Sequence, residues 1–217
     1  MKLLSIALII SLTFAACNNK EPQNKTNLFD TKDLDNQEPK TVEEFYERGN
    51  IHQGMREFNK AIHDYTKAIE IDSNFHKGYF NRAVAYRKIK KYEKAIQDFT
   101  TSLKLNPNDI EALNGRSIMY SKLNNIPLAI DDLTNAIELN PNYTKAYYNR
   151  GNKYFDLKNY KKAIEDYTKC IEIDSNYVDA YSNRGSSKWH LKEDFTSDFK
   201  KACDLGDCEN YNRYCKE

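Results

Sequence analysis

The chain has 217 residues, of which 40% are hydrophobic and 30% are charged, enough for one folded domain and a tail. The 33 Lys and Arg residues nearly cancel the 32 Asp and Glu residues, which leaves a formal net charge of +1. Binding of nucleic acid requires a basic face that displaces phosphate counterions, so this balance excludes nucleic acid from the expected partners.

Residues 1–16 have the composition of a secretory signal peptide. One lysine near the start precedes the apolar run Leu3–Phe14 and two alanines, and the segment is too short to span a membrane once cleavage is counted. Residues 14–17 (Phe-Ala-Ala-Cys) resemble the lipobox of bacterial lipoproteins, with Phe in the place of the usual Leu. That resemblance implies cleavage before Cys17 and acylation of its thiol and amine, which would anchor the chain in a membrane. The alternative is an ordinary signal peptide that happens to precede a cysteine.

The residues after Cys17 bear on location and flexibility. By the sorting rule of bacterial lipoproteins, Asn18 in place of an acidic residue implies the outer membrane, facing either the periplasm or the cell surface. Residues 17–41 have no hydrophobic period and are rich in Asn, Lys, Asp, Pro and Gln, which predicts a flexible polar tether. Thr41 and Glu44 have the spacing of a capping box, so we expect the first helix to begin there.

A period of 34 residues organises the rest of the chain. Within each unit, apolar and small residues recur at helical spacing twice, on either side of a turn. Two short helices per unit predict an all-α fold, an α-solenoid of about five helix-turn-helix repeats over residues 42–205. The expected repeats are 42–75, 76–109, 110–143, 144–177 and 178–205. The fifth lacks two residues, which we place in the turn between its helices, and residues 206–217 are expected to form a capping helix and tail.

The second repeat shows the pattern most completely. Its motif residues, in order, are Tyr79, Arg82, Ala83, Tyr86, Ala95, Phe99 and Pro107. This series resembles the tetratricopeptide repeat, whose aromatic, small and proline positions it follows. The resemblance implies a protein-binding stack in which the first helices of the repeats line a concave groove for an extended peptide or a partner helix.

One departure from that pattern is systematic. Each repeat has Arg where the family more often has Leu, and Asp recurs as regularly in the second helix. The arginines are Arg48, Arg82, Arg116, Arg150 and Arg184, and the aspartates are Asp64, Asp98, Asp132, Asp166 and Asp198. Because an unpaired charge inside a stack is costly, we expect a ladder of partly buried ion pairs that serves as scaffold.

No pattern in the sequence predicts catalysis. The four histidines share no repeat phase and have no metal-ligand spacing, and the chain has neither a Gly-rich phosphate loop nor a nucleophile motif. We therefore expect no enzyme activity, no cofactor, no metal site and no small-molecule substrate. Cys203 and Cys208 flank a glycine turn and are the expected disulfide of an exported chain, while Cys170 is expected in the core.

By analogy of repeat position, aromatic residues, asparagines and two lysines face the expected groove. These residues are Tyr46, Asn50, Lys77, Phe80, Asn81, Asn114, Lys145, Tyr148, Asn149, Asn152 and Asn183. Asn amides satisfy the polar groups of a peptide backbone, and flat rings contact side chains at low entropic cost. The alternative is that the rings pack sideways between neighbouring helices and are mostly buried. The carboxylate clamp of the co-chaperone members of the family is incomplete, since only Asn50 and Asn81 match its positions.

These expectations combine into one function, a membrane-anchored adaptor that binds a peptide or helix of an envelope protein in its concave groove. Two alternatives remain open. One is a structural scaffold of an envelope assembly that uses the ends or the convex face of the solenoid, and the other is a regulator of a peptidoglycan hydrolase. Groove substitutions that preserve the fold distinguish the adaptor from the scaffold.

Overall fold

The computed structural model describes residues 38–215 of the chain. The expected signal peptide, Cys17 and the tether residues up to 37 lie outside this range, as do residues 216 and 217. Within the described range, no helix is both long enough and apolar enough to cross a bilayer.

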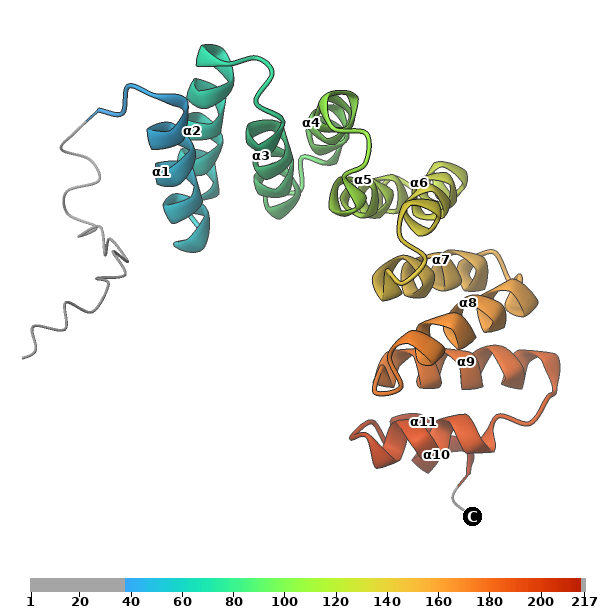
Figure 1. Ribbon diagram of the computed structural model, residues 1–217. Helices are drawn as coiled ribbons and strands as arrows, with labels where there is room; N and C mark the ends of the chain where they lie inside the picture. The colour runs from blue at the N-terminus through green and yellow to red at the C-terminus, as the bar shows by residue number, and fades with distance from the viewer. Residues whose placement is uncertain (1–37, 216–217) are drawn as a thin grey trace, which may run out of the picture. The chain divides into compact units, whose positions relative to one another are not determined.

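Residues 38–215 form eleven helices and no strand, joined by short turns (Figure 1). The helices are α1 (Val42–Gly54), α2 (Phe58–Ile71), α3 (His76–Lys88), α4 (Tyr92–Leu105), α5 (Ile110–Lys122), α6 (Ile126–Leu139), α7 (Thr144–Asp156), α8 (Tyr160–Ile173), α9 (Val178–Leu191), α10 (Thr196–Asp204) and α11 (Glu209–Tyr214). The first ten make five helix-turn-helix pairs, which α11 follows. This arrangement confirms the all-α solenoid that the 34-residue period predicts.

Local hydrogen bonds and turn conformations fix where the helices begin and end. Thr41 Oγ1 accepts a hydrogen bond from the backbone N–H of Glu44 at 3.2 Å, and Glu44 Oε2 accepts one from the backbone N–H of Thr41 at 3.2 Å. This confirms the predicted capping box at the start of α1. In every repeat, one non-glycine residue in the left-handed region turns the chain from the first helix into the second. These residues are Arg56, Lys90, Asn124, Lys158 and Lys192.

The first helices of the repeats form the inner face of the stack. Each helix packs against the next one along the chain, and α1, α3, α5, α7 and α9 also contact one another in succession. Successive second helices, by contrast, make at most marginal contact. Helix pairs stacked in this way curve toward the side on which the helices lie closer together. The side chains of the first helices therefore line the concave side that the repeat pattern predicts.

A ring from the second helix packs over a small residue of the first helix in the core of most repeats. A Cβ atom on Gly49 would lie 2.6 Å from the ring of Tyr65, so only glycine permits this approach. The fully buried rings at this position are Tyr65, Phe99, Tyr167 and Phe199. The third repeat differs, because it has Ser117 and Leu133 at the two positions.

The fifth repeat corrects one prediction, since its missing residues do not come from the turn. The segment that joins α9 to α10 has four residues, one more than the segment that joins α7 to α8. The shortening falls on α10, which has nine residues where α8 has 14. Lys192 ends α9 in the left-handed conformation, and Asp194 Oδ1 accepts a hydrogen bond from the backbone N–H of Thr196 at 3.0 Å. Because the other repeats have the same left-handed residue, the turn held by Asp194 is what delays the start of α10.

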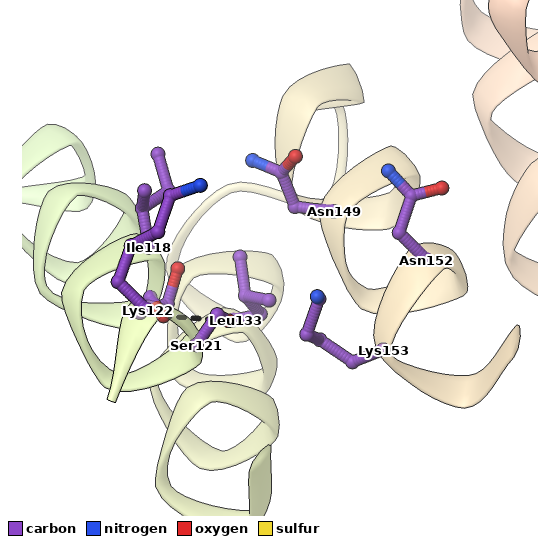
Figure 2. A pocket seen from close by; sticks show the side chains of 8 residues that line it. Ile118, Ser121, Lys122, Leu133, Asn149, Asn152 and Lys153 are labelled. Carbon is purple, nitrogen blue, oxygen red and sulfur yellow. Dashed lines mark hydrogen bonds between the residues drawn. The ribbon is translucent and has the colours of Figure 1, made fainter. Parts of the chain in front are cut away.

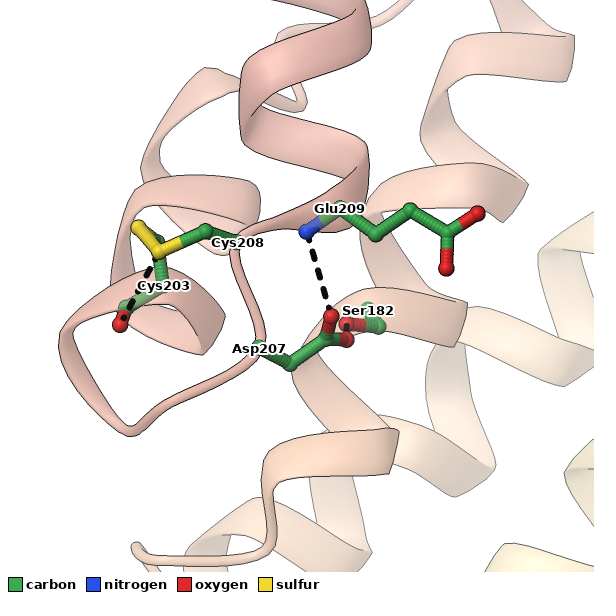
Figure 3. Close-up of a disulfide and its surroundings, with 5 residues drawn as sticks. All are labelled: Ser182, Cys203, Asp207, Cys208 and Glu209. Carbon is green, nitrogen blue, oxygen red and sulfur yellow. Dashed lines mark hydrogen bonds between the residues drawn. A yellow bond between two sulfur atoms is a disulfide. The ribbon is translucent and has the colours of Figure 1, made fainter.

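The end of the stack is tied together by a disulfide and an aspartate (Figure 3). Cys203, in the last turn of α10, is bonded to Cys208, which directly precedes α11. Between them, Asp207 accepts hydrogen bonds from Ser182 Oγ on α9 at 2.6 Å and from the backbone N–H of Glu209 at 3.2 Å. These bonds hold α11 against the last repeat. A terminal repeat needs such a capping element because no further repeat packs on its outer face.

Candidate binding site on the inner face

Every repeat carries an arginine–aspartate pair, as the sequence predicts. In the central repeat, Nε and Nη2 of Arg116 donate to the two carboxylate oxygens of Asp132 at 2.9 and 2.7 Å. The other four pairs make bidentate contacts at distances between 2.6 and 3.2 Å. The arginine side chains are only 12–18% exposed and the aspartates 2–6%. The ladder is therefore confirmed, and its burial makes it part of the scaffold rather than a ligand site.

A further hydrogen bond of the arginines reaches into the preceding repeat. Arg116 Nη1 donates to Thr100 Oγ1 at 3.0 Å, and the arginines of the second, fourth and fifth repeats make the same contact. The four acceptors are Thr66, Thr100, Thr134 and Thr168. The sequence prediction does not include these threonines, although their 34-residue spacing is a signal that identifies them. They bind each of these arginines to the second helix of the preceding repeat.

The aromatic residues expected in the groove lie partly buried between neighbouring helices. Tyr46 makes an edge contact with Phe75, with 5.1 Å between the ring centroids. Phe80 and Tyr148 pack against the buried rings of their own second helices, at centroid distances of 5.7 and 6.1 Å. This is the sideways packing that the sequence left open. The three rings are neither fully buried nor fully exposed, so they form the wall of the inner face rather than projecting freely from it.

The asparagines form hydrogen bonds across the joints between repeats. Asn81 Nδ2 donates to Asn50 Oδ1 at 2.8 Å and to Tyr46 Oη at 3.0 Å, both in the preceding repeat. Asn50 Oδ1 also accepts a hydrogen bond from Tyr65 Oη at 2.8 Å. The fourth and fifth repeats reproduce this arrangement with Tyr148, Asn152, Tyr167 and Asn183. These side chains are therefore positioned by one another, within two similar networks.

The joint between the third and fourth repeats lacks this network. Asn149 Nδ2 donates to Asn114 Oδ1 at 2.7 Å, and Asn114 is buried. Ile118 occupies the position at which Asn50 and Asn152 accept a tyrosine hydroxyl. Asn149 Nδ2 therefore donates one hydrogen bond to the preceding repeat, where Asn81 Nδ2 and Asn183 Nδ2 each donate two.

A hollow of about 240 Å³ opens at this joint, between α5, α6 and α7 (Figure 2). Its lining residues are Ser117, Ile118, Ser121, Lys122, Leu133, Asn149, Asn152 and Lys153. Leu133 accounts for the space, because the other repeats fill this position with a ring that reaches further than leucine does. Of the groove residues expected from the sequence, only Asn149 and Asn152 border the hollow.

The two lysines expected in the groove lie apart from the hollow. Lys77 and Lys145 are both exposed, near the starts of α3 and α7. Lys145 Nζ lies 3.7 Å from Glu111 Oε1 on the preceding first helix, which is an exposed ion pair. The eleven expected residues thus form several separate groups. In the described part of the chain, no group of three His, Cys, Asp or Glu side chains is placed to hold a metal ion.

Comparison with known proteins finds a family model that matches three of the five repeats. The sequence model of the tetratricopeptide repeat matches residues 42–75, 76–109 and 144–177. These are tetratricopeptide repeats. The third repeat, between them, has the same two helices without a match, and its departures from the tetratricopeptide pattern include Ser117 and Leu133 beside the hollow.

Solved tetratricopeptide structures share this fold. A MamA crystal structure is 26% identical, with a TM-score of 0.71 over 81% of this chain and 96% of its own. MamA from Desulfovibrio magneticus RS-1 is 18% identical, with a TM-score of 0.71 over 81% of this chain and 97% of its own. YrrB, described as a TPR protein with an unusual peptide-binding site, is 22% identical, with a TM-score of 0.66 over 81% of this chain and 91% of its own. No curated protein sequence matches the chain. The fold is one whose members act as protein-interaction modules, which bind through their extended concave surfaces.

Proposed function

We propose that this protein is a membrane-anchored adaptor that binds an extended or helical segment of an envelope protein along its inner face. The observation that carries the proposal is the open hollow between α5, α6 and α7. Four of the five repeats fill the corresponding position with a buried ring, so a stack built only as scaffold has no need of the gap. A concave site with apolar walls and a few convergent polar groups is the usual form of a binding pocket.

The amides of the inner face have hydrogen-bonding groups left for a ligand. Asn50 and Asn152 each accept two hydrogen bonds through Oδ1. Among residues 38–215, Asn50 Nδ2 has no hydrogen-bond partner, and Asn152 Nδ2 has only the Tyr148 hydroxyl beside it. A bound peptide backbone offers carbonyl oxygens to such donors. The half-buried rings beside them add apolar contact area that is already held in place and loses little entropy on binding.

The anchor and the location come from the N-terminal sequence, outside the described residues. Residues 14–17 resemble a lipobox, and Asn18 after the cysteine favours the outer membrane, facing the periplasm or the cell surface. Several acyl chains on Cys17 would hold the protein at the membrane firmly. The adaptor is non-catalytic in this proposal, and its ligand belongs to the class named for YrrB, a peptide.

Site-specific photo-cross-linking in the producing cells tests this proposal. A photoreactive amino acid in place of Lys122 lies at the rim of the hollow, and one in place of Lys169 lies on the exposed side of α8 as a matched control. We expect a discrete cross-linked envelope protein from the first position and none from the second. Equal cross-linking from both positions, or none from either, would mean that the inner face is idle and would favour the scaffold alternative.

A further inference from the structure

The hollow of the third repeat presents hydrogen-bond donors to its ligand. Lys122 and Lys153 carry ammonium groups in its lining, and Figure 2 shows the Lys153 ammonium in the space between Leu133 and Asn152. Asn152 turns its Nδ2 group toward this space, because its Oδ1 already accepts two hydrogen bonds from the side of α8 and α9. Two cations and an amide donor favour a negatively charged acceptor.

The remaining polar residues of the lining are Ser117, Ser121 and Asn149. Asn149 Nδ2 donates to Asn114 Oδ1 at 2.7 Å, so this amide adds no donor for the ligand. Ser117 Oγ donates to the backbone carbonyl of Asn114 at 2.7 Å, and Ser121 Oγ donates to the carbonyl of Ser117 at 3.0 Å. Their hydroxyl hydrogens are therefore already used. Lys153 Nζ lies 2.5 Å from Asp156 Oδ2, but the Asp156 side chain is 51% exposed. The Lys153 side chain is 18% exposed, so only the carboxylate end of this pair is well solvated, and Asp156 can return to water when a second carboxylate shares the lysine.

The shape of the hollow selects a ligand with a short apolar stem. Ile118 and Leu133 contribute aliphatic wall, and the charged groups come from residues nearer the ends of α5 and α7. The volume of about 240 Å³ exceeds the roughly 150 Å³ of an engineered protein cavity that admits benzene. A glutamate side chain, with two methylene groups before its carboxylate, matches both the wall and the donors.

We propose that the hollow is a specificity pocket for a glutamate side chain within the bound segment of the partner. Its methylene groups lie against Ile118 and Leu133, and its carboxylate accepts hydrogen bonds from Lys122, Lys153 and Asn152. This inference rests on the proposed function and deepens it, because it states the chemistry that the partner must offer.

One variant removes the space and keeps the surrounding charges. Ser117→Gly with Leu133→Phe copies the pair Gly185 and Phe199 of the fifth repeat. Glycine is needed because a ring over glycine also lies beside an asparagine of the next repeat in the first and fourth repeats, as it would here beside Asn149. The phenylalanine ring occupies the hollow in this filled variant. Circular dichroism and the thermal midpoint should remain close to those of the natural chain, which shows that any change in binding is local.

A second variant keeps the space and removes the charges. Lys122→Gln with Lys153→Gln neutralises the two ammonium groups of the lining. Lys122 is exposed and Lys153 is partly buried, and neither takes part in the arginine–aspartate ladder. This neutral variant and the filled variant are compared with the natural chain, all at full length in detergent micelles.

Phage display of random dodecapeptides supplies the probe. Peptides selected on the natural chain are synthesised with amidated C-termini, so that no terminal carboxylate contributes, and their Kd values are measured by fluorescence anisotropy. We expect the selected peptides to share one glutamate. Its replacement by glutamine should weaken binding to the natural chain about fivefold, as the loss of a partly exposed ion pair does, and should have no effect with either variant.

The outcomes separate this inference from the function on which it rests. If peptides are selected but the glutamine versions bind the natural chain equally well, the glutamate pocket is wrong and the adaptor stands. The same holds if glutamine weakens binding to the filled variant as much as to the natural chain. If repeated selections on the natural chain yield no peptide, the proposed peptide-binding function and the pocket fail together.

Discussion

Replacing Arg116 with leucine, the residue that the tetratricopeptide pattern more often has there, should destabilise the stack. Arg116 donates two hydrogen bonds to Asp132 and one to Thr100, and the Asp132 side chain is only 5% exposed. Arg116→Leu leaves that carboxylate buried without its partner. Breaking a buried pair in this way costs about 3 kcal/mol, which is a large part of the stability of an ordinary domain.

Removing both charges should restore most of the loss. In the double variant Arg116→Leu with Asp132→Leu, no buried charge remains, so we expect the free energy of unfolding to lie within about 1 kcal/mol of the natural value. Asp132→Leu alone leaves the guanidinium without its partner and should also cost about 3 kcal/mol, so the coupling energy of the double-mutant cycle is about 5 kcal/mol. Thr100→Val is the matched control, because it removes only the hydrogen bond to the preceding repeat and should cost about 1 kcal/mol.

Urea unfolding followed by circular dichroism measures these free energies. Because repeats can unfold separately, coincidence of the dichroism and Trp189 fluorescence transitions is needed before a single free energy is assigned. A coupling energy below about 0.5 kcal/mol would refute the reasoning, since the two charges would then act independently.

Three further predictions concern packing, the C-terminal disulfide and the anchor. Gly49→Ala should lower the free energy of unfolding by about 1–3 kcal/mol, because its Cβ would lie 2.6 Å from a buried ring. Gly54→Ala, with no atom within 4 Å of its Cβ, should leave the thermal midpoint nearly unchanged, and equal effects would contradict the packing. Serine at both Cys203 and Cys208 should cost about 2 kcal/mol and speed amide hydrogen exchange in α11, whereas unchanged exchange would show that the disulfide does not hold this helix. Cys17→Ser should abolish palmitate labelling and block processing, and a variant that is cleaved and fractionates like the natural chain would reveal an ordinary signal peptide.

Structural features that recur in every repeat could be predicted from the sequence, because a residue type that returns at the same repeat position indicates the same structural role each time. In four repeats the aspartate follows its arginine by 16 residues, and this regularity indicated a buried pair before any contact was known. Asn81 and Asn183 were placed on the inner face by the same reasoning. Their partners could not be predicted, because repeat position does not give the direction of an amide and the bonds cross to the preceding repeat.

The hollow could not be predicted because it results from the absence of an aromatic ring at residue 133. Leu133 is an unremarkable core residue when read alone, and the space around it depends on whether Ser117 and Ile118 expand to fill it. The late start of α10 escaped prediction for a related reason. A count of residues shows that the fifth repeat is short, but the turn held by Asp194 decides that α10 loses the length.

The way in which buried charge is distributed affects how such a chain can change in length. Each arginine neutralises an aspartate of its own repeat and offers the preceding repeat only a hydrogen bond to a threonine hydroxyl. Duplication or loss of a whole repeat therefore adds or removes a complete buried ion pair, and no arginine or aspartate of the ladder loses its counter-charge. Had the ion pairs crossed the joints, each deletion would have exposed two mismatched charges at the new junction. Because each buried pair is complete within its own repeat, such a gene can gain or lose repeats without first acquiring a compensating substitution in the core.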